Sequence, residues 1–93
     1  MPQEPVRLPA SVTFASAPQV LADASRALAG RACEVDLGGC VEFDSSLIGV
    51  LLELSRQASA AGKAPCRFLA PSANLRKLAL LYGVDELLFV HRD

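Results

Sequence analysis

Apolar side chains recur along this chain at intervals that switch between the period of a strand and the period of a helix. The clearest strand pattern covers residues 32–37, where Cys33, Val35 and Leu37 alternate with two carboxylates. Alternation of period two is typical of a strand with one buried face. The sequence therefore predicts a half-buried strand over 32–37, ended by the glycine pair that follows.

Three segments have apolar residues at helical spacing. They cover residues 16–30, 44–61 and 72–83, and a glycine stands at or just after the end of each. The first and third open on a serine and the second on Asp44, whose carboxylate can accept from free backbone N–H groups at a helix start. Each segment therefore has both a start signal and a stop signal for a helix.

Shorter apolar runs fill the gaps between the predicted helices. Residues 7–8, 12–14 and 66–69 are expected to be strands, and residues 87–90 fit either a last strand or a final helix. Strands that alternate with helices indicate a sheet with helices packed on it. We therefore expect one α/β domain over residues 1–93, with a mixed β-sheet of four to five strands.

Composition narrows the range of partners. The chain has 93 residues, 52% of them apolar, and a formal net charge of −1 without a run of Lys or Arg, which argues against binding to nucleic acid. The apolar stretch of residues 47–52 is far shorter than the roughly 20 residues of a membrane span. The first residues lack the features of a signal peptide. A cytoplasmic protein is expected.

Reactive groups are scarce. The single histidine, His91, stands close to the end of the sequence and is expected to be solvated. Cys33, Cys40 and Cys66 are odd in number and widely spaced, so we expect small core hydrophobes and no disulfide framework. The sequence contains no glycine-rich phosphate loop. We therefore expect no catalytic residue, no cofactor and no metal site.

The segment 44–61 carries the most information about function. A helical wheel at about 100° per residue places four apolar residues of this segment on one stripe, which is expected to face the core. These are Leu47, Leu51, Leu54 and Ala58. A neighbouring stripe mixes aliphatic, small and polar residues: Ser45, Ile48, Gly49, Leu52 and Arg56. Either neighbouring segments bury Ile48 and Leu52, or this stripe is a surface for docking a protein partner.

Ser45 also has two interpretations. Serine suits the first turn of a helix, which is sufficient reason for its presence. Alternatively, Ser45 is a contact or phosphorylation site. A phosphoryl group would be favoured by the helix dipole, but it would add negative charge beside Asp44.

The residues Val41-Glu42-Phe43-Asp44-Ser45-Ser46, followed by an aliphatic helix, resemble the Asp-Ser/Thr-Ser/Ala-Gly signature of STAS domains. The resemblance covers nearly the whole chain and implies a STAS-like fold. The stretch from Asn74 to Val84 is similar to the third helix of the MlaB-like group. Leu47 stands where the family usually has glycine, and Gly49 comes two residues later. A bulky Leu47 is expected to affect how closely a partner approaches.

The resemblance implies a function without catalysis. MlaB-like proteins are cytoplasmic subunits that bind and regulate the ATPase of an ABC transporter moving phospholipids, and they associate with the inner membrane through that complex. The serine corresponding to Ser45 lies at the contact. In the sister group, the anti-sigma-factor antagonists, that serine is phosphorylated by a partner kinase. The residues expected to bind the partner or accept the phosphate are Asp44, Ser45, Ser46, Ile48, Gly49 and Leu52. A third possible role is a module that binds a ligand or nucleotide.

Overall fold

The computed structural model describes residues 4–89 as an α/β domain, which confirms the fold class expected from the sequence. The elements follow in the order β1 (Val6–Arg7), β2 (Ser11–Val12), α1 (Ala17–Leu28), β3 (Glu34–Asp36), β4 (Glu42–Phe43), α2 (Ser46–Ala60), β5 (Arg67–Leu69), α3 (Ala73–Leu81) and α4 (Asp85–Phe89). Val90 and His91, on which two expectations fell, lie outside the described residues.

The strands form two small parallel sheets where one mixed sheet was expected. Their orders are β1-β3-β5 and β2-β4, and all three pairings among residues 4–89 are parallel. Helices α1 and α2 explain the direction, because each connects two successive strands and returns the chain to the end of the sheet where the strands begin. The glycine pair Gly38-Gly39 lies between β3 and β4, where the chain passes from one sheet to the other. Gly38 N donates to Asp36 Oδ1 at 2.8 Å, and a Cβ on Gly39 would lie 2.8 Å from Arg7 Nη2.

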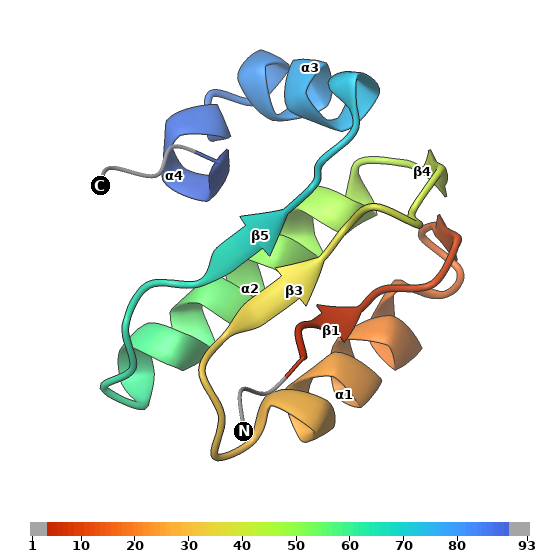
Figure 1. Ribbon diagram of the computed structural model, residues 1–93. Coiled ribbons are helices and arrows are strands. Elements are labelled where there is room, and N and C mark those ends of the chain that lie inside the picture. The colour runs from red at the N-terminus through yellow and green to blue at the C-terminus, as the bar shows by residue number, and fades with distance from the viewer. Residues whose placement is uncertain (1–3, 90–93) are drawn as a thin grey trace.

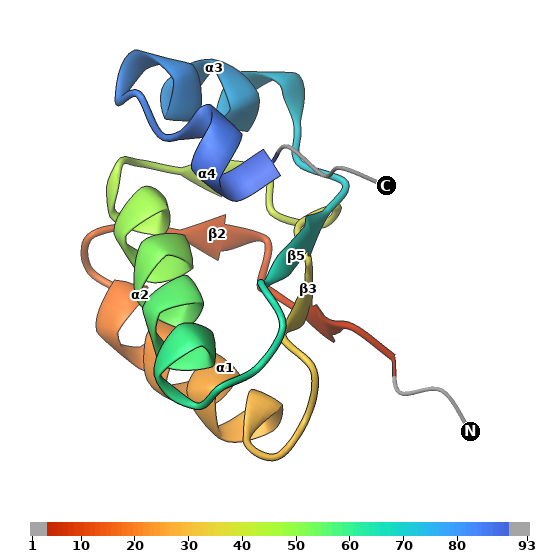
Figure 2. The ribbon, with the colours of Figure 1, turned by 90° about the vertical axis from the view of Figure 1, so that its left-hand side faces the viewer.

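Among residues 4–89, helices cover one face of the larger sheet. Figures 1 and 2 show α1 and α2 on that face, with α3 and α4 beyond one end of the strands. The alternation predicted for β3 fits this arrangement, because Val35 is fully buried while Glu34 and Asp36 are half-buried. Glu34 Oε2 lies 3.6 Å from Arg67 Nη1 on β5. A half-polar strand is therefore suited to a sheet with one open face.

The longest helix, α2, packs as the helical wheel predicted. Its expected core stripe of Leu47, Leu51, Leu54 and Ala58 is buried, with no member more than 3% exposed. The predicted stop also holds, since Gly62 follows the helix with φ +73°, a conformation that favours glycine.

The last described element is a helix, which decides between strand and helix for residues 87–89. The segment begins with Asp85 and Glu86, whose negative charges suit a helix start. Leu88 and Phe89 are then buried in the core, and Leu88 N donates to Val84 O at 3.0 Å. Short apolar runs do not distinguish strand from helix by period alone.

The expectation for the cysteines was wrong in part. Cys33 and Cys66 form a disulfide, with Cα atoms 4.7 Å apart. They come together because each precedes one of two neighbouring strands, β3 and β5, and Arg67 N donates to Cys33 O at 2.8 Å. Cys40 is a free, buried cysteine, as expected for a small core residue, and burial raises the pKa of its thiol.

We predict that Leu51→Ala lowers the free energy of unfolding by about 2–5 kcal/mol, because it leaves a cavity under a fully buried side chain. Urea unfolding followed by circular dichroism measures the change. A loss below about 1 kcal/mol, typical of surface substitutions, would mean that this face of α2 is not packed as described.

We also predict that reduction of the disulfide lowers the free energy of unfolding by about 3–4 kcal/mol, because the cross-link joins residues 33 positions apart. Urea unfolding with and without a thiol reductant measures the difference. Cys66→Ser is the control, since its stability should not respond to reductant. Equal stability of the oxidised and reduced wild type would contradict the prediction.

Candidate functional site

The carboxylate of Asp44 holds together two segments that are distant in sequence. Asp44 follows β4, and its backbone N donates to Val12 O on β2 at 3.3 Å. Its Oδ2 accepts from Phe14 N at 2.9 Å, and its Oδ1 accepts from Ser46 N at 2.9 Å and from the Ser46 hydroxyl. One side chain therefore fixes the turn before α1 against the start of α2.

Helix α2 begins one residue later than predicted, because its N-cap is Ser45 and not Asp44. The capping position belongs to Ser45, but the Ser45 side chain makes no capping hydrogen bond. Asp44 provides an acceptor for Ser46 N from one position earlier. Ser45 is exposed at the start of the helix, and its hydroxyl makes no capping hydrogen bond.

Two carboxyl groups on and beside α2 are held ionised by their neighbours. The hydrogen bond from the Ser46 side chain, followed by those from Phe14 N and Ser46 N, lowers the pKa of Asp44. The hydrogen bonds from Arg56 and Gln57 lower the pKa of Glu53 to about 2, and the charge of Arg56 adds to this effect. Both side chains are therefore negatively charged at neutral pH.

The outward face of α2 carries three of the six residues expected to bind a partner. Ser45, Gly49 and Arg56 are exposed, and Leu52 is half-buried. A Cβ built on Gly49 meets no atom within 4 Å, so nothing in the described part of the chain requires glycine there. We call Ser45, Gly49, Leu52 and Arg56 the outward face of α2.

Two aliphatic residues near this helix start do not lie on the outward face. Ile48 is 5% exposed and is part of the core, so the interpretation in which neighbouring elements bury it is correct. Leu47, which replaces the usual glycine of the signature, is fully buried. Its side chain therefore lies in the core and not on the surface of the helix start.

Two exposed apolar residues near Asp44 were not predicted as site residues. Phe14 is 84% exposed and donates its backbone N–H to the Asp44 carboxylate, and Val41 is 76% exposed just before β4. The sequence pattern assigned Phe14 to a strand, which hid its exposure. Large apolar side chains in solvent are informative when they gather beside a candidate site. Phe14 therefore extends the candidate surface beyond α2.

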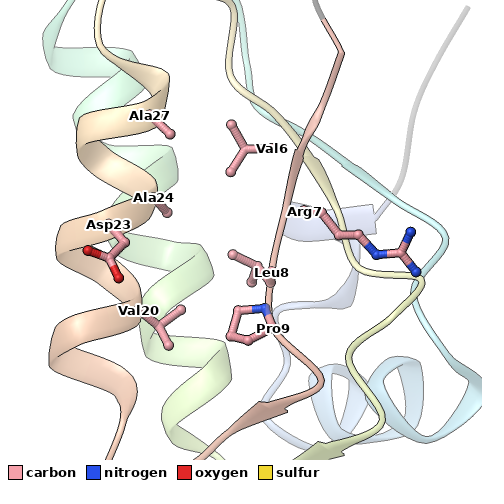
Figure 3. Close-up of a pocket in the computed structure, with 8 residues that line it drawn as sticks. All are labelled: Val6, Arg7, Leu8, Pro9, Val20, Asp23, Ala24 and Ala27. Atoms are coloured by element: carbon pink, nitrogen blue, oxygen red, sulfur yellow. The ribbon is translucent and has the colours of Figure 1, made fainter.

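A separate pocket lies between β1 and α1. Figure 3 shows Val6 and Leu8 pointing toward α1, while Arg7 points away from the helix. Its lining on the helix is mostly apolar, with Val20, Ala24 and Ala27, and its one carboxylate, Asp23, pairs with Arg26 on the same helix. The pocket therefore does not bring together groups for acid–base or nucleophilic chemistry.

Within residues 4–89, no group of three or more His, Cys, Asp or Glu side chains is placed to hold a metal ion. None of the described helices has the length and apolar character needed to cross a membrane.

A family model described as Mlab, STAS domain, matches residues 3–90. The match includes all the described elements and the whole candidate surface. A search of curated proteins finds none that matches the chain.

We predict that Asp44 makes the stability of the domain depend on pH. A carboxyl group whose pKa is lowered by folding stabilises the fold above its unfolded pKa of about 4, and this contribution is lost as the pH falls through the folded value. Asp44→Ala should therefore be less stable than wild type at pH 7, and the difference should shrink below about pH 4.

Urea unfolding at several pH values measures this difference. Ser45→Ala is the control, because it removes a neighbouring hydroxyl that neither titrates nor caps the helix. If the difference between Asp44→Ala and wild type stayed constant from pH 7 to pH 3, the hydrogen bonds of Asp44 would not be its source.

Proposed function

Because the chain belongs to the STAS domain family, in its MlaB-like group, we propose that it is a non-catalytic subunit that binds and regulates the ATPase of an ABC transporter moving phospholipids. Such a transporter maintains the lipid asymmetry of the outer membrane. The chain would act in the cytoplasm, where thiols are kept reduced and the Cys33–Cys66 disulfide would be open, and it would reach the inner membrane through the complex. STAS domains in general have regulatory and binding roles, and the partner is the specific part of this proposal.

The observation that carries the proposal is the outward face of α2. Glycine inside a helix costs roughly 0.5–1 kcal/mol relative to alanine, and Gly49 has no neighbour that requires its small size. A partner whose backbone or side chains approach α2 closely would explain a glycine at this position. Phe14, exposed beside Asp44, supplies apolar area at the edge of the same surface.

A second candidate function is an anti-sigma-factor antagonist that is switched by phosphorylation of Ser45. The exposure of Ser45 and its lack of a capping bond favour this function, because a kinase needs a free hydroxyl. The ionised Asp44 carboxylate beside it argues in the other direction, since a phosphoryl group would add like charge there. Binding without phosphorylation is therefore the function that we prefer.

We predict that Ser45→Glu weakens binding of the ATPase about tenfold or more, equivalent to about 1.4 kcal/mol. The new carboxylate would lie beside Asp44 and repel an apolar or acidic partner surface. The fold should be unchanged, because negative charge suits a helix start. The amount of ATPase that co-purifies with the tagged chain measures binding, and Ala22→Glu on the exposed side of α1 is the control. Full retention of the ATPase by Ser45→Glu would remove Ser45 from the contact.

For Gly49 we predict opposite effects on stability and on binding. Gly49→Leu should raise the free energy of unfolding by about 0.5–1 kcal/mol, because leucine is a better helix former and the site has free space. The same substitution should reduce ATPase binding, since its side chain projects from the outward face. Urea unfolding and co-purification measure the two effects. Normal binding by Gly49→Leu would show that no partner approaches this position closely.

A further inference from the structure

The disulfide joins the two segments that lead from a helix into a strand of the larger sheet. Cys33 lies on the connection from α1 to β3, and Cys66 lies on the connection from α2 to β5. Figures 1 and 2 show both connections at the end of the sheet where β3 and β5 begin. Lys63 Nζ, from the second connection, donates to Leu28 O at the end of α1 at 2.9 Å. The disulfide is therefore not alone in holding the two connections together.

The backbone keeps the two cysteines close without help from the sulfur–sulfur bond. Arg67 N donates to Cys33 O at 2.8 Å, and Glu34 on β3 lies opposite Arg67 on β5 in the parallel ladder that follows. Neither contact involves a cysteine side chain, so neither depends on the disulfide. The fold itself therefore holds the Cα atoms, 4.7 Å apart, within the range that a disulfide spans.

The structure also places a hydrogen-bond acceptor beside Cys66. Cys66 Sγ lies 3.6 Å from Leu54 O on α2. A thiol is a weak hydrogen-bond donor, whereas a disulfide sulfur carries no hydrogen. When the disulfide opens, the Cys66 thiol can therefore donate to α2, while Cys33, which is 4% exposed, stays in the core as a small apolar residue. The oxidised and the reduced pair both fit this packing.

The two cysteines differ in their access to solvent. Cys33 is buried, whereas Cys66 is half-buried and lines a groove together with Leu52 of α2 and Leu87 of α4. The volume of the groove, about 490 Å³, is within the roughly 300–1,000 Å³ of pockets that take small molecules. Leu87 is 71% exposed, so the groove is open to solvent. A dissolved thiol or disulfide can therefore reach Cys66 more readily than Cys33.

From these features we propose that Cys33 and Cys66 form a reversible redox site that exchanges with small-molecule thiols and disulfides of the glutathione class, and that exchange begins at Cys66. The reducing surroundings in which the pair would rest as two thiols come from the cytoplasmic location in the proposed function. Oxidation closes a cross-link between the connections that follow α1 and α2, so the oxidised domain is the more stable form.

Oxidation proceeds in two exchange steps. The Cys66 thiolate attacks one sulfur of glutathione disulfide, which forms a mixed disulfide on Cys66 and releases one glutathione thiolate. The Cys33 thiolate then attacks the Cys66 sulfur, which forms the protein disulfide and releases the second glutathione thiolate. The two protons lost by the cysteines pass to the two glutathiones. Two protein thiols are thereby oxidised to one disulfide, and one glutathione disulfide is reduced.

The first test compares the two cysteines in the purified full chain. Cys33→Ser cannot complete the second step, so glutathione disulfide should leave a mixed disulfide on Cys66. Cys66→Ser is the matched variant, and its buried Cys33 should be modified at least about tenfold more slowly. Mass spectrometry of the peptides locates the glutathione, and circular dichroism checks that both variants are folded. Equal rates at the two cysteines, or no mixed disulfide on Cys66, would overturn the proposal.

The second test follows the wild-type chain in its native cell. Free thiols are alkylated before, during and after treatment with diamide, which oxidises glutathione, and mass spectrometry identifies the cysteines that remain reduced. Cys33 and Cys66 should be reduced in growing cells, joined during the treatment and reduced again after the oxidant is removed. Buried Cys40 is the internal control and should stay reduced throughout.

Two results in the cell would contradict a reversible site. A disulfide that is already closed in growing cells would be a permanent structural cross-link, and two thiols that stay reduced during the treatment would not be a redox site. Neither test measures the ATPase, so either result leaves the proposed partner standing. Conversely, failure to recover an ATPase with the chain would overturn the proposed function without changing the exchange measured on the purified chain.

Discussion

The packing of α2 on the sheet is the constraint on which the rest of this structure depends. Among residues 4–89, helices cover one face of the larger sheet, and α2 buries Leu47, Leu51 and Leu54 against it. Because the helix turns every 3.6 residues, burial of this stripe determines which residues point away from it. Ser45 and Gly49 are therefore presented to solvent by the same packing that stabilises the core.

The hydrogen bonds of the Asp44 carboxylate connect the packed helix α2 to the rest of the candidate surface. The carboxylate accepts from Phe14 N and Ser46 N, so the turn before α1 and the start of α2 are held as one surface. Nothing in this arrangement activates a nucleophile or gathers reactive groups, and each Asp44 bond has a structural purpose. A rigid surface with an open glycine and an exposed aromatic residue is suited to recognition of a protein.

Much of the fold could be predicted from local patterns. Periodicity located α2 and its core stripe, and the alternation in 32–37 identified the half-buried strand. The Cys33–Cys66 disulfide could not be predicted, because it depends on β3 and β5 being neighbours and their order is not a local property. The short α4 remained ambiguous because its apolar run is too short for its period to be decisive. For the site, the wheel located the outward face, but it could not separate exposed Gly49 from buried Ile48, since burial there depends on neighbouring elements.

The most direct test of the central claim is affinity purification of the wild-type chain from its native cell in mild detergent, with mass spectrometry of the bound proteins and of Ser45. If the chain binds its partner without being phosphorylated, we expect the purified sample to contain a stoichiometric ABC ATPase with its membrane permease. Ser45 should then be unmodified. A histidine-kinase-like protein in their place, together with phosphate on Ser45, would contradict the account and identify the chain as a phosphorylation switch.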